Sequence, residues 1–252
     1  MSKHLYIPDA QIYDGVPLDH IQAAGELIMD ERPDVIVIIG DWWDFPSLES
    51  FSPATKIAYE HRSYISDYNA GVDALELLLR PMKEYNEHRR RNRKKAYKPR
   101  IVFTTGNHEY RVDRVLDQQP NLVGALPLVQ DHLKSLGIEV HEFKVPVLID
   151  GVNYCHFCPQ ELSAGAVGRA HLIASKRHES WTTGHIQIFD YHVSMHTPRL
   201  QCLIMGAFYM QDEGYKTGSN DHFRGLAVKR NVRDGEYDPE FISIDSLLQR
   251  YN

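Results

Sequence analysis

Residues 101–109 read I-V-F-T-T-G-N-H-E, and this stretch decides the fold. Three apolar residues and two threonines are typical of a strand, and Gly106 ends that run before three polar residues. In an open α/β sheet, ligands bind just beyond the carboxyl ends of the strands, so this turn is a candidate site. The alternative is a surface turn whose glycine and asparagine only supply unusual backbone angles. The sequences of the other strands decide between a ligand site and a surface turn.

The chain before this stretch repeats the pattern of a strand that ends in a polar turn. The pattern predicts strands at 3–7 and 34–39, and helices at 18–32 and 57–92. Asp9 follows the first strand, and the sequence G-D-W-W-D at 40–44 follows the second. Because strand–helix–strand crossovers are right-handed, we expect the polar turns to meet at one edge of a parallel sheet.

The chain after this stretch is richer in short strands. Helices are expected at 111–118, 126–136 and 168–176, and strands at 138–143, 145–149, 152–157, 181–187, 188–194, 200–206, 223–232 and 237–244. The two halves together predict an α/β fold with two facing mixed β-sheets flanked by helices. We expect one domain over residues 1–252, with a helical basic insertion around 53–99 and a C-terminal antiparallel hairpin region around 188–252.

The composition indicates an ordinary globular chain, with 42% hydrophobic and 25% charged residues among 252. Without a long apolar run or an apolar leader, we expect a cytoplasmic protein with no membrane partner. The formal charge of -6 argues against a protein that coats nucleic acid by bulk electrostatics. Cys155, Cys158 and Cys202 are too few for a disulfide framework, and we expect the C-x-x-C pair to pack in a strand.

Five polar segments are expected at one edge of the sheet. They are D-A-Q at 9–11, G-D-W-W-D at 40–44, G-N-H-E at 106–109, His156, and G-H-I-Q at 184–187. Carboxylate, amide and imidazole groups in such a set suit two divalent ions that share one carboxylate. In extended segments, side chains two residues apart point the same way, so Asp9 with Gln11 and His185 with Gln187 would face the cluster.

The order of these segments resembles the calcineurin-like metallophosphoesterases, whose motifs are D-x-H, G-D-x-x-D, G-N-H-E/D, a lone His and G-H-x-H. The resemblance covers residues 9–187. The segments H-F-R-G-L-A-V at 222–228 and V-R-D-G-E-Y-D-P-E-F at 232–241 are also similar to phage and prophage members. The resemblance implies a metal-dependent hydrolase of phosphoesters, in the host cytoplasm if the chain is phage-encoded.

The resemblance also implies which residues hold the two ions. One ion would be held by Asp9, Gln11, Asp41 and Gln187, and the other by Asp41, Asn107, His156 and His185. Glutamine stands at 11 and 187, where the family usually has histidine, so the first site would offer only oxygen ligands. We therefore expect Mn²⁺, with Mg²⁺, Ni²⁺, Fe or Zn²⁺ as alternatives, and weaker binding of the first ion. The other interpretation is that the first site is lost.

Other residues receive roles from the same resemblance. His108 would give a proton to the leaving oxygen, and Asp44 and Glu109 would orient it and the ligands. His192 and His196 are alternatives to His156 as a ligand. Trp42 and Trp43 are expected to pack, although a tryptophan beside a phosphate site could also stack a nucleobase.

The substrate is the least determined part of the interpretation. The arginine that follows G-D-x-x-D in protein serine/threonine phosphatases is missing, which sets that class aside. We expect a phosphodiesterase acting on nucleotides or nucleic acid, with a phosphomonoesterase second and a catalytically silent metal-binding module third.

The basic run H-R-R-R-N-R-K-K at 88–95 is either a solvated helix end or, if it faces the metal edge, a surface that binds the nucleic-acid backbone. The sequence indicates no oligomeric state.

Overall fold

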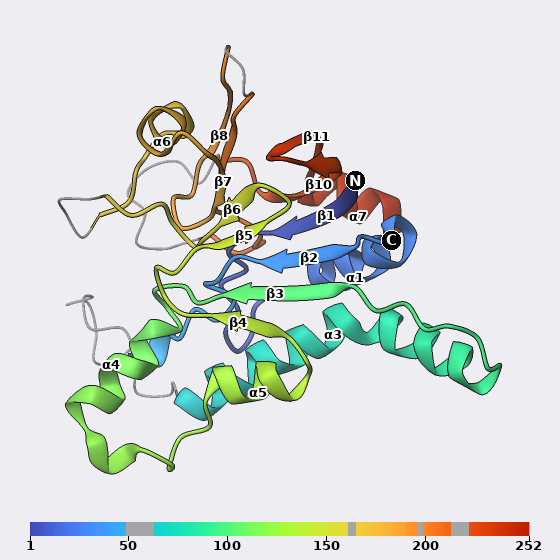
Figure 1. Ribbon diagram of the computed structural model, residues 1–252. Coiled ribbons are helices and arrows are strands. Elements are labelled where there is room, and N and C mark those ends of the chain that lie inside the picture. Colours follow the sequence, from blue (N-terminus) through green and yellow to red (C-terminus); the bar gives the residue numbers. More distant parts are fainter. Residues whose placement is uncertain (49–62, 161–164, 196–198, 213–221, 252) are drawn as a thin grey trace.

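Two β-sheets face each other in the computed structural model, which describes residues 1–48, 63–160, 165–195, 199–212 and 222–251 (Figure 1). The first sheet has six strands in the order β11-β10-β1-β2-β3-β4, and the second has five in the order β5-β6-β7-β9-β8. The first consists of β1 (Ser2–Ile7), β2 (Val35–Ile38), β3 (Arg100–Thr104), β4 (Glu139–His141), β10 (Gly225–Arg233) and β11 (Glu236–Ser243). The second consists of β5 (Val147–Ile149), β6 (Val152–Tyr154), β7 (Ser180–Thr183), β8 (Phe189–Val193) and β9 (Gln201–Met205).

Both sheets are mixed, which confirms the predicted fold class. In the first sheet β1 to β4 are parallel and the hairpin of β10 and β11 joins β1 in antiparallel fashion. In the second sheet β6, β7 and β9 are parallel, while β5 and β8 are antiparallel edge strands. The two C-terminal hairpins, β8 with β9 and β10 with β11, are both antiparallel and belong to different sheets.

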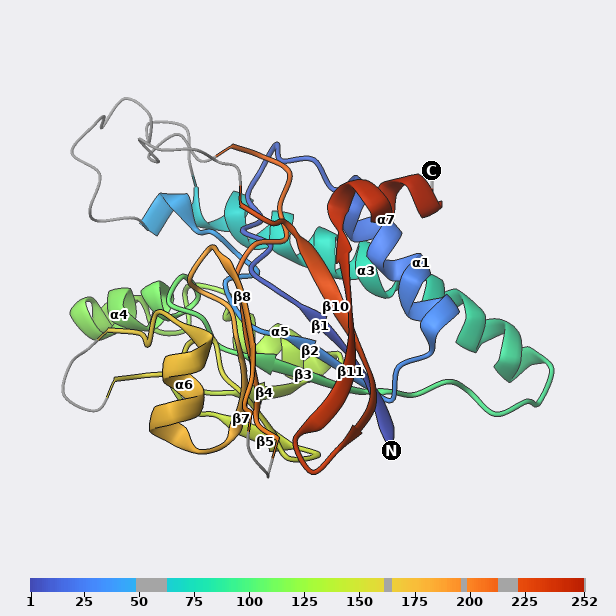
Figure 2. The ribbon, with the colours of Figure 1, turned by 90° about the horizontal axis from the view of Figure 1, so that it is seen from above.

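Helices cover the outer faces of both sheets (Figure 2). The elements are α1 (Asp19–Glu31), α3 (Tyr64–Arg91), α4 (Tyr110–Gln118), α5 (Val129–Ser135), α6 (Ala170–Arg177) and α7 (Ile244–Tyr251), with 3-10 turns η1 (Pro46–Leu48) and η2 (Pro120–Leu122). Helices α1, α3, α5 and α7 pack on the first sheet, and α6 packs on the second. None of the described helices is long and apolar enough to cross a membrane.

Successive side chains of the central strands point to opposite faces of the first sheet, so the core consists of one layer under the helices and one layer between the sheets. In β1, Leu5 and Ile7 face the helices, while Tyr6 between them faces the second sheet. In β2, Ile36 faces the helices and Val37 faces the second sheet in the same way. Both faces of these strands are buried, which is why their sequences are continuous apolar runs.

The structure differs from the sequence expectation at several strand ends: the strands expected at 152–157 and 181–187 end at Tyr154 and Thr183, and a helix follows the last strand. Residues 244–251 form α7, although only a strand end was predicted there. The apolar residues Ile244, Leu247, Leu248 and Tyr251 have helical spacing, so the signal is present but short. Helix α3 begins after Ser63, whose side chain accepts a hydrogen bond from the Ser66 amide (3.2 Å). Residues 57–62 of the expected helix lie outside the described residues.

The three cysteines are free and buried. They pack with the apolar face of α6 in a small core of their own, which includes Ile173 and Trp181. Burial raises the pKa of the Cys155 and Cys202 thiols to about 11, so both stay protonated at neutral pH. The C-x-x-C pair therefore packs as expected, but it lies in the segment that follows β6 and not within a strand.

Acid should destabilise the protein through His20, which is fully buried in α1. Its Nε2 donates to the Phe208 carbonyl (3.0 Å), its Nδ1 has no partner among the described residues, and burial lowers its pKa from 6.5 to about 4. The folded state therefore binds fewer protons than the unfolded state between these values, and stability falls as pH drops through this window. We expect a loss of roughly 2–3 kcal/mol from this group between pH 7 and pH 4.

Urea unfolding at pH 7 and pH 4 measures this loss. The His20→Leu variant should lose less stability than the parent protein between the two pH values. His88→Leu, at an exposed position of α3, is the matched control and should behave like the parent. An identical pH dependence in His20→Leu and the parent would contradict the prediction.

Candidate metal centre

The carboxyl ends of β1, β2 and β3 lie at the same edge of the first sheet, and the polar turns leave from there (Figure 1). Two turns are joined directly, because the Gln11 amide donates to the Asp41 carbonyl (2.9 Å). The second sheet adds its own turns to this edge. The His185 amide donates to both carboxylate oxygens of Asp9 (3.1 and 3.0 Å), and His156 Nδ1 lies 3.0 Å from the Ile39 carbonyl oxygen.

Two glycines allow the turns to approach the carboxylates. A Cβ atom on Gly106 would lie 2.1 Å from Asp41 Oδ1, and one on Gly184 would lie 2.2 Å from Asp9 Oδ1. Carbon and oxygen atoms cannot approach so closely without displacement. The glycines of G-N-H-E and G-H-I-Q are therefore required by contact with these two aspartates.

Three side chains form a cluster that could hold a metal ion. Ligand atoms of Asp41, His156 and His185 all lie within 4.8 Å of one another. His156 is fully buried, and its Nε2 lies 3.2 Å from Asp41 Oδ2 and 3.0 Å from Asn107 Oδ1. Because the Ile39 carbonyl accepts a hydrogen bond from Nδ1, the Nε2 atom is the one directed at these oxygens.

The buried charges in this cluster shift one another's pKa values. Burial alone would lower the pKa of His156, but the Asp41 and Asp9 carboxylates outweigh burial and raise it to about 9. Burial also holds the pKa of Asp9 well above its usual range, and the nearby Asp41 acts in the same direction. For Asp41, burial is outweighed by His108 and His156, which hold its pKa below its usual range. Without a metal, a proton on His156 supplies the positive charge between these oxygens.

The two glutamines lie on the turns that carry Asp9 and His185, but the backbone there is not extended. Gln11 has φ 48° and His185 has φ 61°, both in the left-handed region. The argument that residues two apart share a face is therefore wrong for both pairs, because it holds only for extended segments. Gln11 is buried and Gln187 is half-buried. Their service as metal ligands stays a prediction.

His108 lies beside the cluster and between two charged residues. Its amide donates to Asp41 Oδ1 (2.9 Å), its Nδ1 lies 2.8 Å from Asp44 Oδ1, and its Nε2 lies 3.0 Å from Arg111 Nη2. Burial opposes protonation of His108, but Asp41 and Asp44 raise its pKa. Arg111 is not among the residues that the sequence motifs indicate, although it follows G-N-H-E by only two positions.

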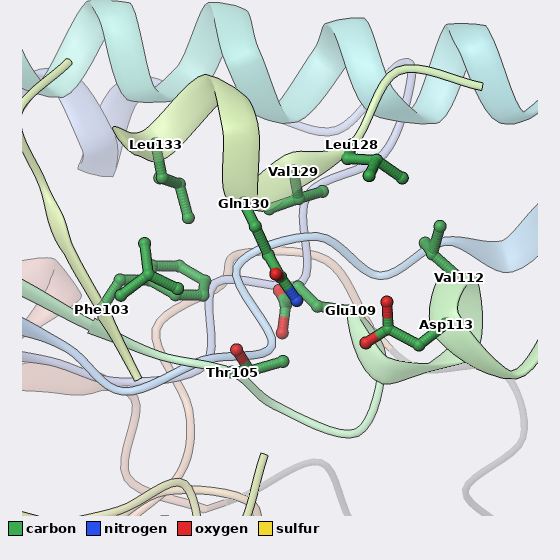
Figure 3. A pocket seen from close by; sticks show the side chains of 10 residues that line it. Phe103, Thr105, Glu109, Val112, Asp113, Leu128, Val129, Gln130 and Leu133 are labelled. Atoms are coloured by element: carbon green, nitrogen blue, oxygen red, sulfur yellow. The ribbon is translucent and has the colours of Figure 1, made fainter. Parts of the chain in front are cut away.

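Glu109 is buried behind the cluster and holds two turns together. Its Oε2 accepts from the amides of Asp41 and Gly106 (both 2.9 Å), and its Oε1 accepts from the Trp43 amide (3.0 Å). Burial, followed by the charge of Asp41, raises its pKa to about 7. Figure 3 shows Glu109 on the wall of a small pocket of about 20 Å³, roughly the space of one water molecule.

Both tryptophans after Asp41 point away from the site. Trp42 and Trp43 are fully buried, and their indole N–H groups donate to the α3 carbonyls of Gly71 and Tyr68 (3.0 Å each). A buried ring cannot stack a nucleobase. The substrate contact considered for them is therefore corrected to packing, which was the preferred expectation.

The basic run at 88–95 lies at the opposite end of the sheet from the metal cluster. It ends α3, and the following residues lead into the amino end of β3, whereas the cluster lies at the carboxyl end (Figure 1). Part of its charge is paired locally, since Arg91 contacts Glu87 (2.5 Å). The run therefore does not form a nucleic-acid track to the site.

Of the two histidine alternatives to His156, only His192 lies within the described residues, and it lies away from the cluster. His192 lies in β8 opposite Cys202, near the start of β9, and its ring lies 6.2 Å from that of His171. His196 lies outside the described residues. Of the three, His156 is the one found in the cluster with Asp41.

Comparison with known proteins gives little further guidance. No family model and no curated protein matches the chain. One similar solved structure is that of YfcE, a phosphoesterase from E. coli, with 13% sequence identity and a TM-score of 0.42 over 96% of this chain and 99% of that one. A likeness of this degree assigns neither a family nor an activity.

Proposed function

We propose that this chain is a metal-dependent hydrolase of phosphoesters. The observation that supports it best is the buried convergence of Asp41, His156 and His185, with Asn107 at 3.0 Å from His156. Carboxylate, imidazole and amide groups fit divalent transition metals. The proposed ligands are Asp9, Gln11, Asp41 and Gln187 for one ion, and Asp41, Asn107, His156 and His185 for the other.

The residues around the cluster fit such a reaction. Two bound ions would neutralise the phosphate oxygens and lower the pKa of a water molecule that attacks phosphorus. His108, between Asp44 and Asp41, would hold a proton for the leaving oxygen. Glu109 fixes the backbone of Asp41 and Gly106, and so positions the proposed shared carboxylate.

Small phosphodiesters such as nucleotide esters are the first proposed substrates. Polynucleotides lose support, because the tryptophans are buried and the basic run lies at the other end of the sheet. Phosphomonoesters are the second candidate, favoured by the guanidinium of Arg111 beside His108. An extra positive group next to the site suits a substrate with more negative charge.

Hydrolysis of two model esters tests the proposal. Bis(p-nitrophenyl) phosphate and p-nitrophenyl phosphate would be assayed with Mn²⁺, Mg²⁺, Ni²⁺ and Zn²⁺ after removal of bound metal. Faster turnover of the diester supports the first candidate, and faster turnover of the monoester supports the second. No hydrolysis of either ester with any metal would leave a silent metal-binding module.

The glutamines should make the two metal sites unequal. We expect calorimetry to show a weaker and a tighter site, with Mn²⁺ or Mg²⁺ preferred over Zn²⁺ at the weaker one, because amide oxygen is a harder ligand than imidazole. Gln11→His and Gln187→His should each increase Zn²⁺ affinity at that site. Gln22→His, at an exposed position of α1, is the control. Equal and tight Zn²⁺ binding at both sites of the unmodified protein would contradict the prediction.

A further inference from the structure

Arg111 lies in the first turn of α4, two residues after Glu109, and its guanidinium reaches the candidate metal centre. Its Nη1 donates to the Asp44 carbonyl (2.8 Å) and lies within 3.4 Å of the Phe45 carbonyl. These two carbonyls belong to the turn that follows the proposed shared ligand Asp41. The guanidinium is therefore held in place by backbone atoms.

The other end of the guanidinium contacts His108. Arginine has only donors, so Nη2 donates to His108 Nε2 (3.0 Å) when that nitrogen carries no proton. A neutral ring nitrogen is a weak partner for a guanidinium compared with an anionic oxygen. Within the part of the chain that the structure describes, no carboxylate forms an ion pair with Arg111. Its positive charge, beside His108, is therefore not paired with a carboxylate of these residues.

We propose that Arg111 binds a phosphate oxygen of the substrate, exchanging its contact with His108 Nε2 for that oxygen. The inference rests on the proposed function and assigns a new residue to it. Such an exchange would also leave Nε2 of His108 free to take up a proton, which the charges of Asp41 and Asp44 favour, and to give that proton to the leaving oxygen. Because the contact is electrostatic, it contributes more to the binding of a phosphate with two negative charges than to that of a diester, which carries one.

The test compares Arg111→Gln, Arg111→Lys and the matched control Arg114→Gln in the Mn²⁺-loaded protein. Arg114 is exposed on the same helix, three residues further on. The probes are inorganic phosphate as an inhibitor, p-nitrophenyl phosphate and bis(p-nitrophenyl) phosphate. Arg111→Gln should weaken phosphate binding and raise KM for the monoester about tenfold or more, with a smaller change for the diester.

The other variants and the Mn²⁺ affinity distinguish a phosphate-binding role of Arg111 from a structural role. Arg111→Lys should restore part of the phosphate affinity, because it keeps the charge but loses the planar fork. Arg114→Gln should match the parent, and Mn²⁺ affinity by calorimetry should be the same in all variants. Unchanged phosphate inhibition in Arg111→Gln overturns the inference. A loss of Mn²⁺ affinity in Arg111→Gln as large as its loss of phosphate affinity also overturns it, because that result would indicate a structural role.

The same variants distinguish failure of the inference from failure of the proposed function. If the parent hydrolyses neither ester, the proposed function fails, and phosphate binding to the Mn²⁺-loaded protein is then measured directly by calorimetry. A tenfold weaker binding in Arg111→Gln supports the role of Arg111 as an anion-binding residue, whereas equal binding overturns it.

Discussion

His108→Ala is expected to lower turnover of esters with poor leaving groups by about 10²–10⁴-fold, the usual contribution of a positioned general acid. The ring lies between Asp44 and Asp41, and both carboxylates favour its protonated form. A phenolate with a high pKa needs a proton as it departs, whereas p-nitrophenolate needs it much less. The loss should therefore be larger for phenyl phosphate than for p-nitrophenyl phosphate.

Three measurements check this expectation. The ratio of kcat for the two esters gives the dependence on the leaving group, and Mn²⁺ calorimetry shows whether the metal sites persist. His88→Ala, at an exposed position near the end of α3, controls for loss of an imidazole elsewhere. Full activity of His108→Ala on phenyl phosphate would exclude His108 as the acid.

The position of the site could be predicted from the sequence because strand ends carry it. Short apolar runs stop at Asp9, Asp41 and Gly106, and in a parallel sheet such stops share one edge. His156 follows β6 by two residues and joins them because β6 and β7 face the first sheet. The order of the strands and the position of their ends therefore indicated the edge of the sheet, and the resemblance to known motifs indicated which residues there would form the cluster.

The directions of individual side chains could not be predicted in this way. Gln11 and His185 adopt left-handed backbone angles, which depend on hydrogen bonds across the turns and not on local propensity. Trp43 follows a site residue but turns into the core against Tyr68, since α3 offers a carbonyl for its N–H. Arg111 is missed because its significance lies in contacts with the Asp44 turn, 67 positions away.

Glu109→Ala is expected to lower the free energy of unfolding by more than about 3 kcal/mol. The side chain accepts hydrogen bonds from the amides of Asp41, Trp43 and Gly106, and all three would lose their partner in a buried place. Each buried donor left without a partner costs about 1–3 kcal/mol. Glu109→Gln should cost less free energy of unfolding, because the side-chain oxygen of glutamine can still accept a hydrogen bond from some of these amides. Its NH₂ group cannot accept, and it faces the remaining amide donors.

Urea unfolding in EDTA and then in Mn²⁺ separates the two consequences of this change. In EDTA the loss reports the missing hydrogen bonds alone. In Mn²⁺ the stabilisation by metal should also shrink, because a bound ligand stabilises the folded state according to its affinity and the backbone of Asp41 would no longer be fixed. Asp113→Ala removes a half-buried carboxylate from the same pocket wall and should change neither quantity by as much. A Glu109→Ala protein within about 1 kcal/mol of the parent, less than one such unpaired donor costs, would show that Glu109 does not hold these turns together.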